Sequence, residues 1–182
     1  MQKQKLLVSL FFLFLVAALV IAESGHASVP ELTRLMGIQP GRKWTYRVSA
    51  PGSTCASGDF ESKVLSITNN STNTYVEISS WCSAMDKFLL SIEADRVTTS
   101  GSLMIIGPLA ESTRWSVGNV EHSLRRTPDI TVQGHQYNDC WTVMKTSPYY
   151  SGVDVYCNDS GMVRSLSSSS GHVFRVELLR TE

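Results

Sequence analysis

Four cysteine thiols carry the most distinctive chemistry of this sequence, because thiols form either disulfides or metal sites. They are Cys55, Cys82, Cys140 and Cys157. A zinc site usually contains a CxxC pair or a close Cys/His pair, and the sequence has neither. If the chain is exported, an even number of cysteines favours disulfides over metal. Four cysteines allow three connectivities, so the pairing must come from the strands that carry them.

The stretch Asn158-Asp159-Ser160-Gly161 has the residue types of two protease motifs. A serine protease would also need a partner His and Asp in a much larger double barrel, and no His-Cys box precedes the stretch. An aspartic protease would need an apolar strand directly before Asp159, where polar Asn158 stands. The same residues suit a tight turn, and we interpret them as one. A Gly-x-Ser-x-Gly elbow, a P-loop and an HExxH motif are all absent from the sequence.

The histidines beyond the N-terminal segment are His122, His135 and His172. Each falls on a separate candidate strand or turn, without ligand spacing or a paired carboxylate, so we expect surface positions. The sequence accordingly predicts no catalytic residue, no metal site and no cofactor. The alternative is a secreted hydrolase whose catalytic site is scattered over the sheet. Clustering of one of these histidines with a carboxylate in a cleft would favour that alternative.

Two groups of aromatic residues could bind a ligand or a partner. The tryptophans are Trp44, Trp81, Trp115 and Trp141. They could converge inside a curved sheet, either as ordinary core residues or as the wall of a hydrophobic pocket. As candidate binding residues we single out Trp44, Trp115 and Trp141.

The second group is the pair Tyr149 and Tyr150, which follow Pro148 at the tip of a candidate hairpin. Strand alternation sends adjacent residues to opposite faces, so at least one of the two tyrosines should be exposed. Exposed tyrosines suit contacts with a partner.

The N-terminus has the layout of a secretory signal peptide. Lys3 and Lys5 form a positive region, residues 6–22 are apolar except for Ser9, and small residues precede position 28. We expect cleavage after Ala27, with Ala22 as the second choice. An uncleaved anchor is the competing interpretation, since seventeen apolar residues are at the short limit of what spans a bilayer. The sequence thus predicts a signal peptide at 1–27, one β-rich domain at 28–182, and an exported bacterial protein that is periplasmic or extracellular.

Short alternating runs dominate the rest of the chain. Trp44, Tyr46 and Val48 alternate with polar residues, and segments 87–92 and 173–178 show a similar alternation within themselves. Such alternation is typical of antiparallel strands with one buried face. The apolar run 103–106 is either a strand covered on both sides or a hydrophobic loop. We expect about nine to eleven strands in one mostly antiparallel, strongly curved sheet or open barrel. A short helix over 29–36, with Gly37 as its stop, should precede them.

Two candidate hairpins suggest which cysteines pair. If segments 139–146 and 153–157 pair about a centre between Pro148 and Tyr149, Cys140 lies directly opposite Cys157. If segments 60–68 and 75–82 pair around the turn-rich residues 69–73, Cys82 comes to the end where the loop with Cys55 begins. We therefore expect Cys140–Cys157 and Cys55–Cys82 disulfides, the second joining the first loop to the third strand.

The balance of charged residues bears on which classes of partner the protein could bind. The chain has 16 basic and 16 acidic residues and a formal net charge of zero. Without a basic excess to neutralise phosphates, nucleic-acid binding is disfavoured. Membrane contact is expected only through the N-terminal segment, if it is retained.

Four stretches together resemble a group of small exported bacterial envelope proteins of unknown function. They are residues 40–46 (Pro-Gly-Arg-Lys-Trp-Thr-Tyr, similar to PG-x-x-W-x-Y), 107–115 with Gly-Pro-Leu and Thr-Arg-Trp, 131–141 (similar to TVPAG-x-F-x-x-C-W), and 156–165 with Gly-Met-Val-Arg-Ser. Gln133 and His135 depart from that group's turn. The resemblance implies a fold similar to the curved sheets of periplasmic lipoprotein carriers, and it implies no catalytic residues. The function expected is a non-enzymatic envelope protein that binds an apolar molecule or another envelope protein.

Overall fold

The computed structural model describes residues 29–82, 85–100 and 102–182. The predicted signal peptide at 1–27 lies outside these residues and stays a prediction. In chain order the elements are α2 (Val29–Leu35), β1 (Lys43–Ser49), β2 (Gly58–Asn69), β3 (Thr74–Ser79), β4 (Lys87–Ile92), β5 (Arg96–Thr99), β6 (Ser102–Ile106), β7 (Arg114–Val117), β8 (Val120–Thr127), β9 (Ile130–Val132), β10 (His135–Tyr137), β11 (Cys140–Ser147), β12 (Tyr150–Cys157), β13 (Gly161–Ser169) and β14 (His172–Thr181).

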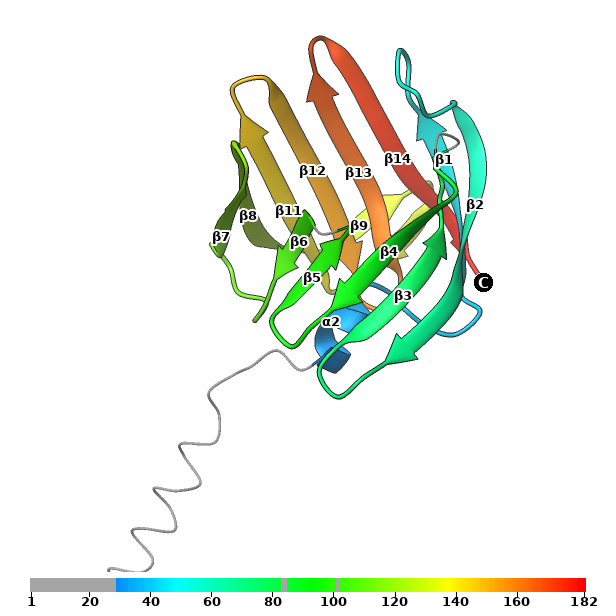
Figure 1. Cartoon of the computed structure of the whole chain (residues 1–182). Coiled ribbons are helices and arrows are strands. Elements are labelled where there is room, and N and C mark those ends of the chain that lie inside the picture. Colours follow the sequence, from blue (N-terminus) through cyan, green and yellow to red (C-terminus); the bar gives the residue numbers. More distant parts are fainter. Residues whose placement is uncertain (1–28, 83–84, 101) are drawn as a thin grey trace, which may run out of the picture.

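Twelve of the strands form one antiparallel sheet, in the order β6-β5-β4-β3-β2-β1-β14-β13-β12-β11-β8-β7. Two meanders meet where β1 pairs with β14, and the sheet curves until its edge strands β6 and β7 approach each other (Figure 1). The predicted all-β class, the curved antiparallel sheet and the short N-terminal helix are therefore confirmed. The predicted number of strands was too low, because β5, β7, β9 and β10 have only three or four residues each. Runs of that length show too little alternation to be recognised.

The alternation predicted for β1 correctly identifies its buried face. Trp44, Tyr46 and Val48 are each at most 5% exposed, and the neighbouring β14 adds Val176 and Leu178 to the same side of the sheet. Burial of apolar side chains such as these is the main favourable term in folding, at about 25 cal/mol per Å² of apolar area. The run 103–106 belongs to the edge strand β6.

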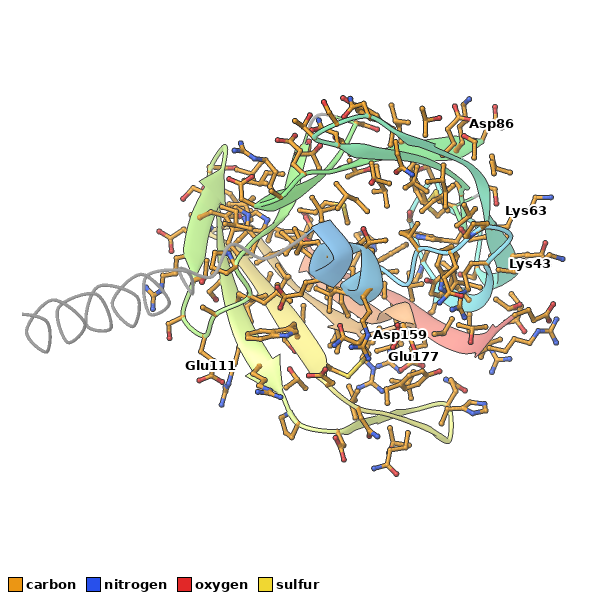
Figure 2. The ribbon with its side chains drawn as sticks, turned by 90° about the horizontal axis from the view of Figure 1, so that it is seen from below. Lys43, Lys63, Asp86, Glu111, Asp159 and Glu177 are labelled. Carbon is orange, nitrogen blue, oxygen red and sulfur yellow. A yellow bond between two sulfur atoms is a disulfide. The ribbon has the colours of Figure 1, made fainter. Side chains whose placement is uncertain are left out.

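A second, two-stranded sheet of β9 and β10 covers part of the convex face. It lies outside the ring of strands in Figure 2. Glu177 projects from that face of β14, which the alternating sequence pattern predicts to be exposed to solvent. The prediction was wrong for this residue, which is only 8% exposed. Its carboxylate accepts hydrogen bonds from Gln133 Nε2 at 2.6 Å and Arg164 Nε at 3.2 Å, so its charge is compensated beneath the small hairpin.

Both disulfides have the pairing that the hairpins predict, Cys140–Cys157 and Cys55–Cys82. In the β11–β12 hairpin, Cys140 stands directly opposite Cys157 and Ser147 opposite Tyr150, so the predicted register is correct. The other bridge differs in one detail. Cys82 was expected on the third strand, but β3 ends at Ser79 and Cys82 lies in the loop that follows. A bulge in the β2–β3 pairing shifts the register of this hairpin.

The helix α2 lies in the opening at one end of the ring of strands (Figure 2). Leu32 and Leu35 are fully buried, and the backbone nitrogen of Asp159 donates to the carbonyl of Arg34 at 2.8 Å. Their side chains also form an exposed ion pair. Trp44 Nε1 donates to the carbonyl of Ser160 at 2.8 Å. Residues 158–160 form a turn between β12 and β13, as predicted, and this turn holds the helix.

Candidate functional site

The concave face of the sheet encloses an apolar cavity of about 270 Å³. Its apolar and aromatic lining comes from the end of α2 and from strands on both halves of the sheet: Met36, Trp44, Tyr46, Ile78, Trp81, Phe88, Leu90, Met104, Tyr156 and Met162. Small-molecule sites usually measure roughly 300–1,000 Å³ and have this mostly apolar character. Trp81 completes one wall by packing against Phe88 and Phe174, with ring centroids 6.1 and 5.6 Å apart.

A second cavity of about 330 Å³ adjoins the first toward the edge strands β6 and β7. Both cavities share the lining residues Thr99, Met104, Lys145, Asp154 and Tyr156. The second adds the polar side chains of Ser102, His122 and Tyr150 and the apolar ones of Leu103, Val117 and Val120. The curved sheet thus holds one continuous site whose polar part, around Lys145 and Asp154, lies where the two cavities meet.

Asp154 is the centre of the polar part. It is 6% exposed and forms an ion pair with Lys145 Nζ. Ser165 Oγ donates to Oδ1 of Asp154 at 2.7 Å. The Tyr156 hydroxyl donates at 3.4 Å to Oδ2, the oxygen that Lys145 contacts. Burial, followed by the charge of Asp154, raises the pKa of Tyr156 well above its usual range. The phenol therefore stays protonated and remains a hydrogen-bond donor.

The β11–β12 register brings Lys145 and Asp154 together. Val143 lies opposite Asp154 and Lys145 lies opposite Gly152, so Lys145 and Asp154 are diagonal neighbours on the concave face, within reach of each other. Gly152 leaves room for the Tyr150 ring, because a Cβ there would lie 2.6 Å from the Tyr150 hydroxyl. This pair is absent from the residues predicted for the site, although the same register that predicts the disulfide places Lys145, Asp154 and Tyr156 on one face.

The prediction for His122 was wrong. It was expected on the surface, but it is only 8% exposed and its ring stacks on Trp115 with centroids 5.2 Å apart and planes 17° apart. Its strand β8 pairs with the edge strand β7 and with β11, which places His122 opposite both Trp115 and Lys145. Nδ1 lies 3.2 Å from the carbonyl of Val120 and must donate to it, since a carbonyl only accepts.

Burial lowers the pKa of His122 below its usual 6.5, and the nearby Lys145 acts in the same direction. The unfolded chain therefore binds a proton at a higher pH than the folded protein does. We expect the free energy of unfolding to fall as the pH is lowered through 6.5. Urea unfolding at several pH values should show this, and a His122→Phe variant, which keeps an aromatic ring beside Trp115, should show a smaller decrease. An equal decrease in both proteins would contradict the assignment.

The other predicted binding residues are dispersed. Trp44 lines the inner cavity and Tyr150 the outer one. Trp115 is buried against His122, and its Nε1 has no hydrogen-bond partner among the residues that the structure describes. Trp141 is half-buried and belongs to neither cavity wall, and Tyr149 at the β11–β12 turn is 82% exposed. Trp81 lines the inner cavity although it was not singled out.

The described ranges lack a metal-binding cluster and a membrane-spanning helix. No cluster of three or more His, Cys, Asp or Glu residues there could hold a metal ion. No helix in them is long and apolar enough to cross a membrane.

Three solved structures are similar to this chain. One, from Bacteroides fragilis, is described as an exported protein with a YmcC-like fold; it has 13% identity and a TM-score of 0.49, over 79% of this chain and 96% of that one. A protein described as a lipoprotein from Parabacteroides distasonis has 10% identity and a TM-score of 0.47, over 78% and 95%. MucB in complex with MucA(peri) has 13% identity and a TM-score of 0.37, over 78% and 49%. No known family profile and no curated protein matches the sequence.

Proposed function

We propose that this is a non-enzymatic, exported binding protein of the bacterial envelope that holds an apolar ligand inside its curved sheet. The observation that carries the proposal is the cavity on the concave face, whose wall is mostly aromatic and aliphatic. Burying an apolar molecule there removes its surface and the surface of the wall from water, which favours binding.

The compartment follows from two features taken together. Disulfides form and persist in oxidising environments such as the periplasm and the cell exterior, and the chain contains two of them. The N-terminal 27 residues have the composition of a secretory signal. Both features support an exported protein.

Another envelope protein is the second class of partner. The feature that favours it is Tyr149, which leaves 82% of its surface exposed on the two-residue turn between β11 and β12. Tyrosine is enriched at protein interfaces because its ring offers a large apolar area with a polar tip. This contact lies outside the cavity and is compatible with a ligand inside it.

A hydrolase remains the alternative, because His122 and Asp154 line the same cavity. Their hydrogen bonds favour binding instead. His122 Nδ1 is engaged by the Val120 carbonyl, whereas a general base is normally oriented by a carboxylate at this nitrogen. Asp154 is engaged by Lys145, Ser165 and Tyr156. We therefore place binding before hydrolysis.

Fluorescence quenching tests the proposal directly. Trp44 and Trp81 line the inner cavity, so 1-bromododecane bound there should quench their emission, and extraction should return the probe unchanged. A Thr99→Phe substitution fills the junction of the two cavities and should weaken binding by about tenfold, equivalent to roughly 1.4 kcal/mol. The matched control is Thr98→Phe, one residue along β5, whose side chain belongs to neither wall. Absence of saturable quenching, or equal weakening by both variants, would reject the proposal.

A further inference from the structure

The charges of the site are balanced within its wall. Among the described residues that line the two cavities, Lys145 and Asp154 are the only ones with a formal charge once histidine is neutral. They form an ion pair with each other. Their side chains are 24% and 9% exposed, so the pair lies largely out of water, where an additional charge would be poorly solvated.

His122 adds a hydrogen-bond acceptor without adding charge. Because Nδ1 carries the proton donated to the Val120 carbonyl, the neutral ring presents Nε2 as an acceptor. Burial lowers the pKa of this histidine; the Val120 hydrogen bond and Asp154 act in the opposite direction and Lys145 in the same one, and the net shift is downward. The imidazole is therefore neutral at pH 7.

Donors are present beside this acceptor. An ammonium group has three N–H donors, and the contact with Asp154 occupies one of the donors of Lys145. Tyr150 contributes a hydroxyl to the outer cavity, and hydroxyls both donate and accept. The junction of the two cavities and the outer cavity therefore offer donors and acceptors within a balanced set of charges, while the rest of the inner cavity offers mostly apolar surface.

Resting on the proposed function, we infer that the ligand is an amphiphile with an uncharged head group that both donates and accepts hydrogen bonds, such as an acylglycerol. Its hydrocarbon chain lies against Trp44 and Trp81 in the inner cavity, and its head group lies beside Lys145, His122 and Tyr150. An anionic or cationic head group would leave one uncompensated charge in this enclosed site. Burying such a charge costs more than its hydrogen bonds return.

Three probes with the same dodecyl-length chain test this selectivity at pH 7: monododecanoylglycerol, dodecanoate and dodecyltrimethylammonium. Each is titrated against the full chain by displacement of 1-bromododecane, below the concentration at which it forms micelles. We expect the glycerol ester to bind at least about tenfold more tightly than either charged probe, a difference of roughly 1.4 kcal/mol.

Substitutions then shift the charge balance in a known direction. Asp154→Asn keeps a similar shape but leaves the Lys145 ammonium uncompensated, so it should reverse the preference toward dodecanoate. Combining it with Lys145→Met removes both charges and should restore preference for the glycerol ester. Asp59→Asn is the matched control, because Asp59 pairs with Arg47 at the surface and its loss should leave selectivity unchanged.

The outcomes separate this inference from the proposed function. If 1-bromododecane does not bind, or if none of the three probes displaces it, the proposal of an apolar ligand is rejected altogether. Binding of all three probes with equal affinity, or tighter binding of dodecanoate by the unmodified protein, overturns only the uncharged head group. These titrations of the unmodified protein decide the matter even if Asp154→Asn fails to fold.

Discussion

Replacing Gly37 with alanine is expected to lower the free energy of unfolding by roughly 3–5 kcal/mol. Gly37 follows α2 with a φ of +64°, a conformation that costs L-residues roughly 1–2 kcal/mol. A Cβ at this position would also lie 2.6 Å from the Gly161 nitrogen and 2.7 Å from the Ser160 carbonyl carbon. Both are backbone atoms, at the end of the turn and the start of β13, and cannot move aside as a flexible side chain could. Urea unfolding followed by tryptophan fluorescence measures the effect.

Gly118→Ala is the matched control. Gly118 has a φ of +59°, and a Cβ there would meet no atom within 4 Å. This substitution should therefore show only the backbone cost, roughly 1–2 kcal/mol. Equal destabilisation by the two variants would mean that the end of α2 does not pack closely against the turn at residues 158–160. The difference between them measures the contact itself.

The contact between α2 and this turn also matters for the candidate site. Met36, at the end of the helix, lines the inner cavity. Trp44 lines it as well, while its Nε1 holds the carbonyl of Ser160. One end of the cavity is thus formed by Met36 from the helix and by Trp44, which is hydrogen-bonded to the turn that holds the helix, and a displaced helix would open that end to water.

Local pattern was sufficient to predict the β11–β12 hairpin. Apolar and polar residues alternate along its strands, and its turn has two residues. Together these features fix the register of the hairpin. That register alone places Cys140 opposite Cys157. The Cys55–Cys82 bridge was less determined, because the β2–β3 bulge and the loop after Ser79 change the path of the chain in a way that alternation does not reveal.

The polar part of the site could not be recognised in the same way. A lysine, an aspartate or a histidine on a strand normally faces water, and the sequence analysis gave His122 that surface position. Strand pairing puts Lys145, Asp154 and His122 on one face, but that face is enclosed only because β1 pairs with β14 and the sheet curves until its edges approach. That closure joins residues more than a hundred positions apart, and no local pattern specifies it.

Loss of the Cys140–Cys157 bridge is expected to lower the free energy of unfolding by roughly 2–5 kcal/mol, the usual cost of removing a native disulfide. The variant is Cys140→Ser with Cys157→Ser, which leaves no unpaired thiol. Restricting the unfolded chain over a separation of 17 residues accounts for about 3 kcal/mol in the chain-entropy description. Both sulfurs are buried, so the two serine hydroxyls add a further cost. Urea unfolding of the oxidised protein measures the difference.

Cys55→Ser with Cys82→Ser is the comparison that separates these two contributions. Its separation of 27 residues gives a slightly larger entropic term, about 3.5 kcal/mol, but Cys55 is only half-buried. If burial of the serine hydroxyls matters, the Cys140/Cys157 variant is the less stable of the two despite its shorter loop. If loop length alone decides, the order is reversed. Non-reducing peptide mapping of the unmodified protein is the check on both, because a Cys82–Cys140 or Cys55–Cys157 peptide would contradict the pairing.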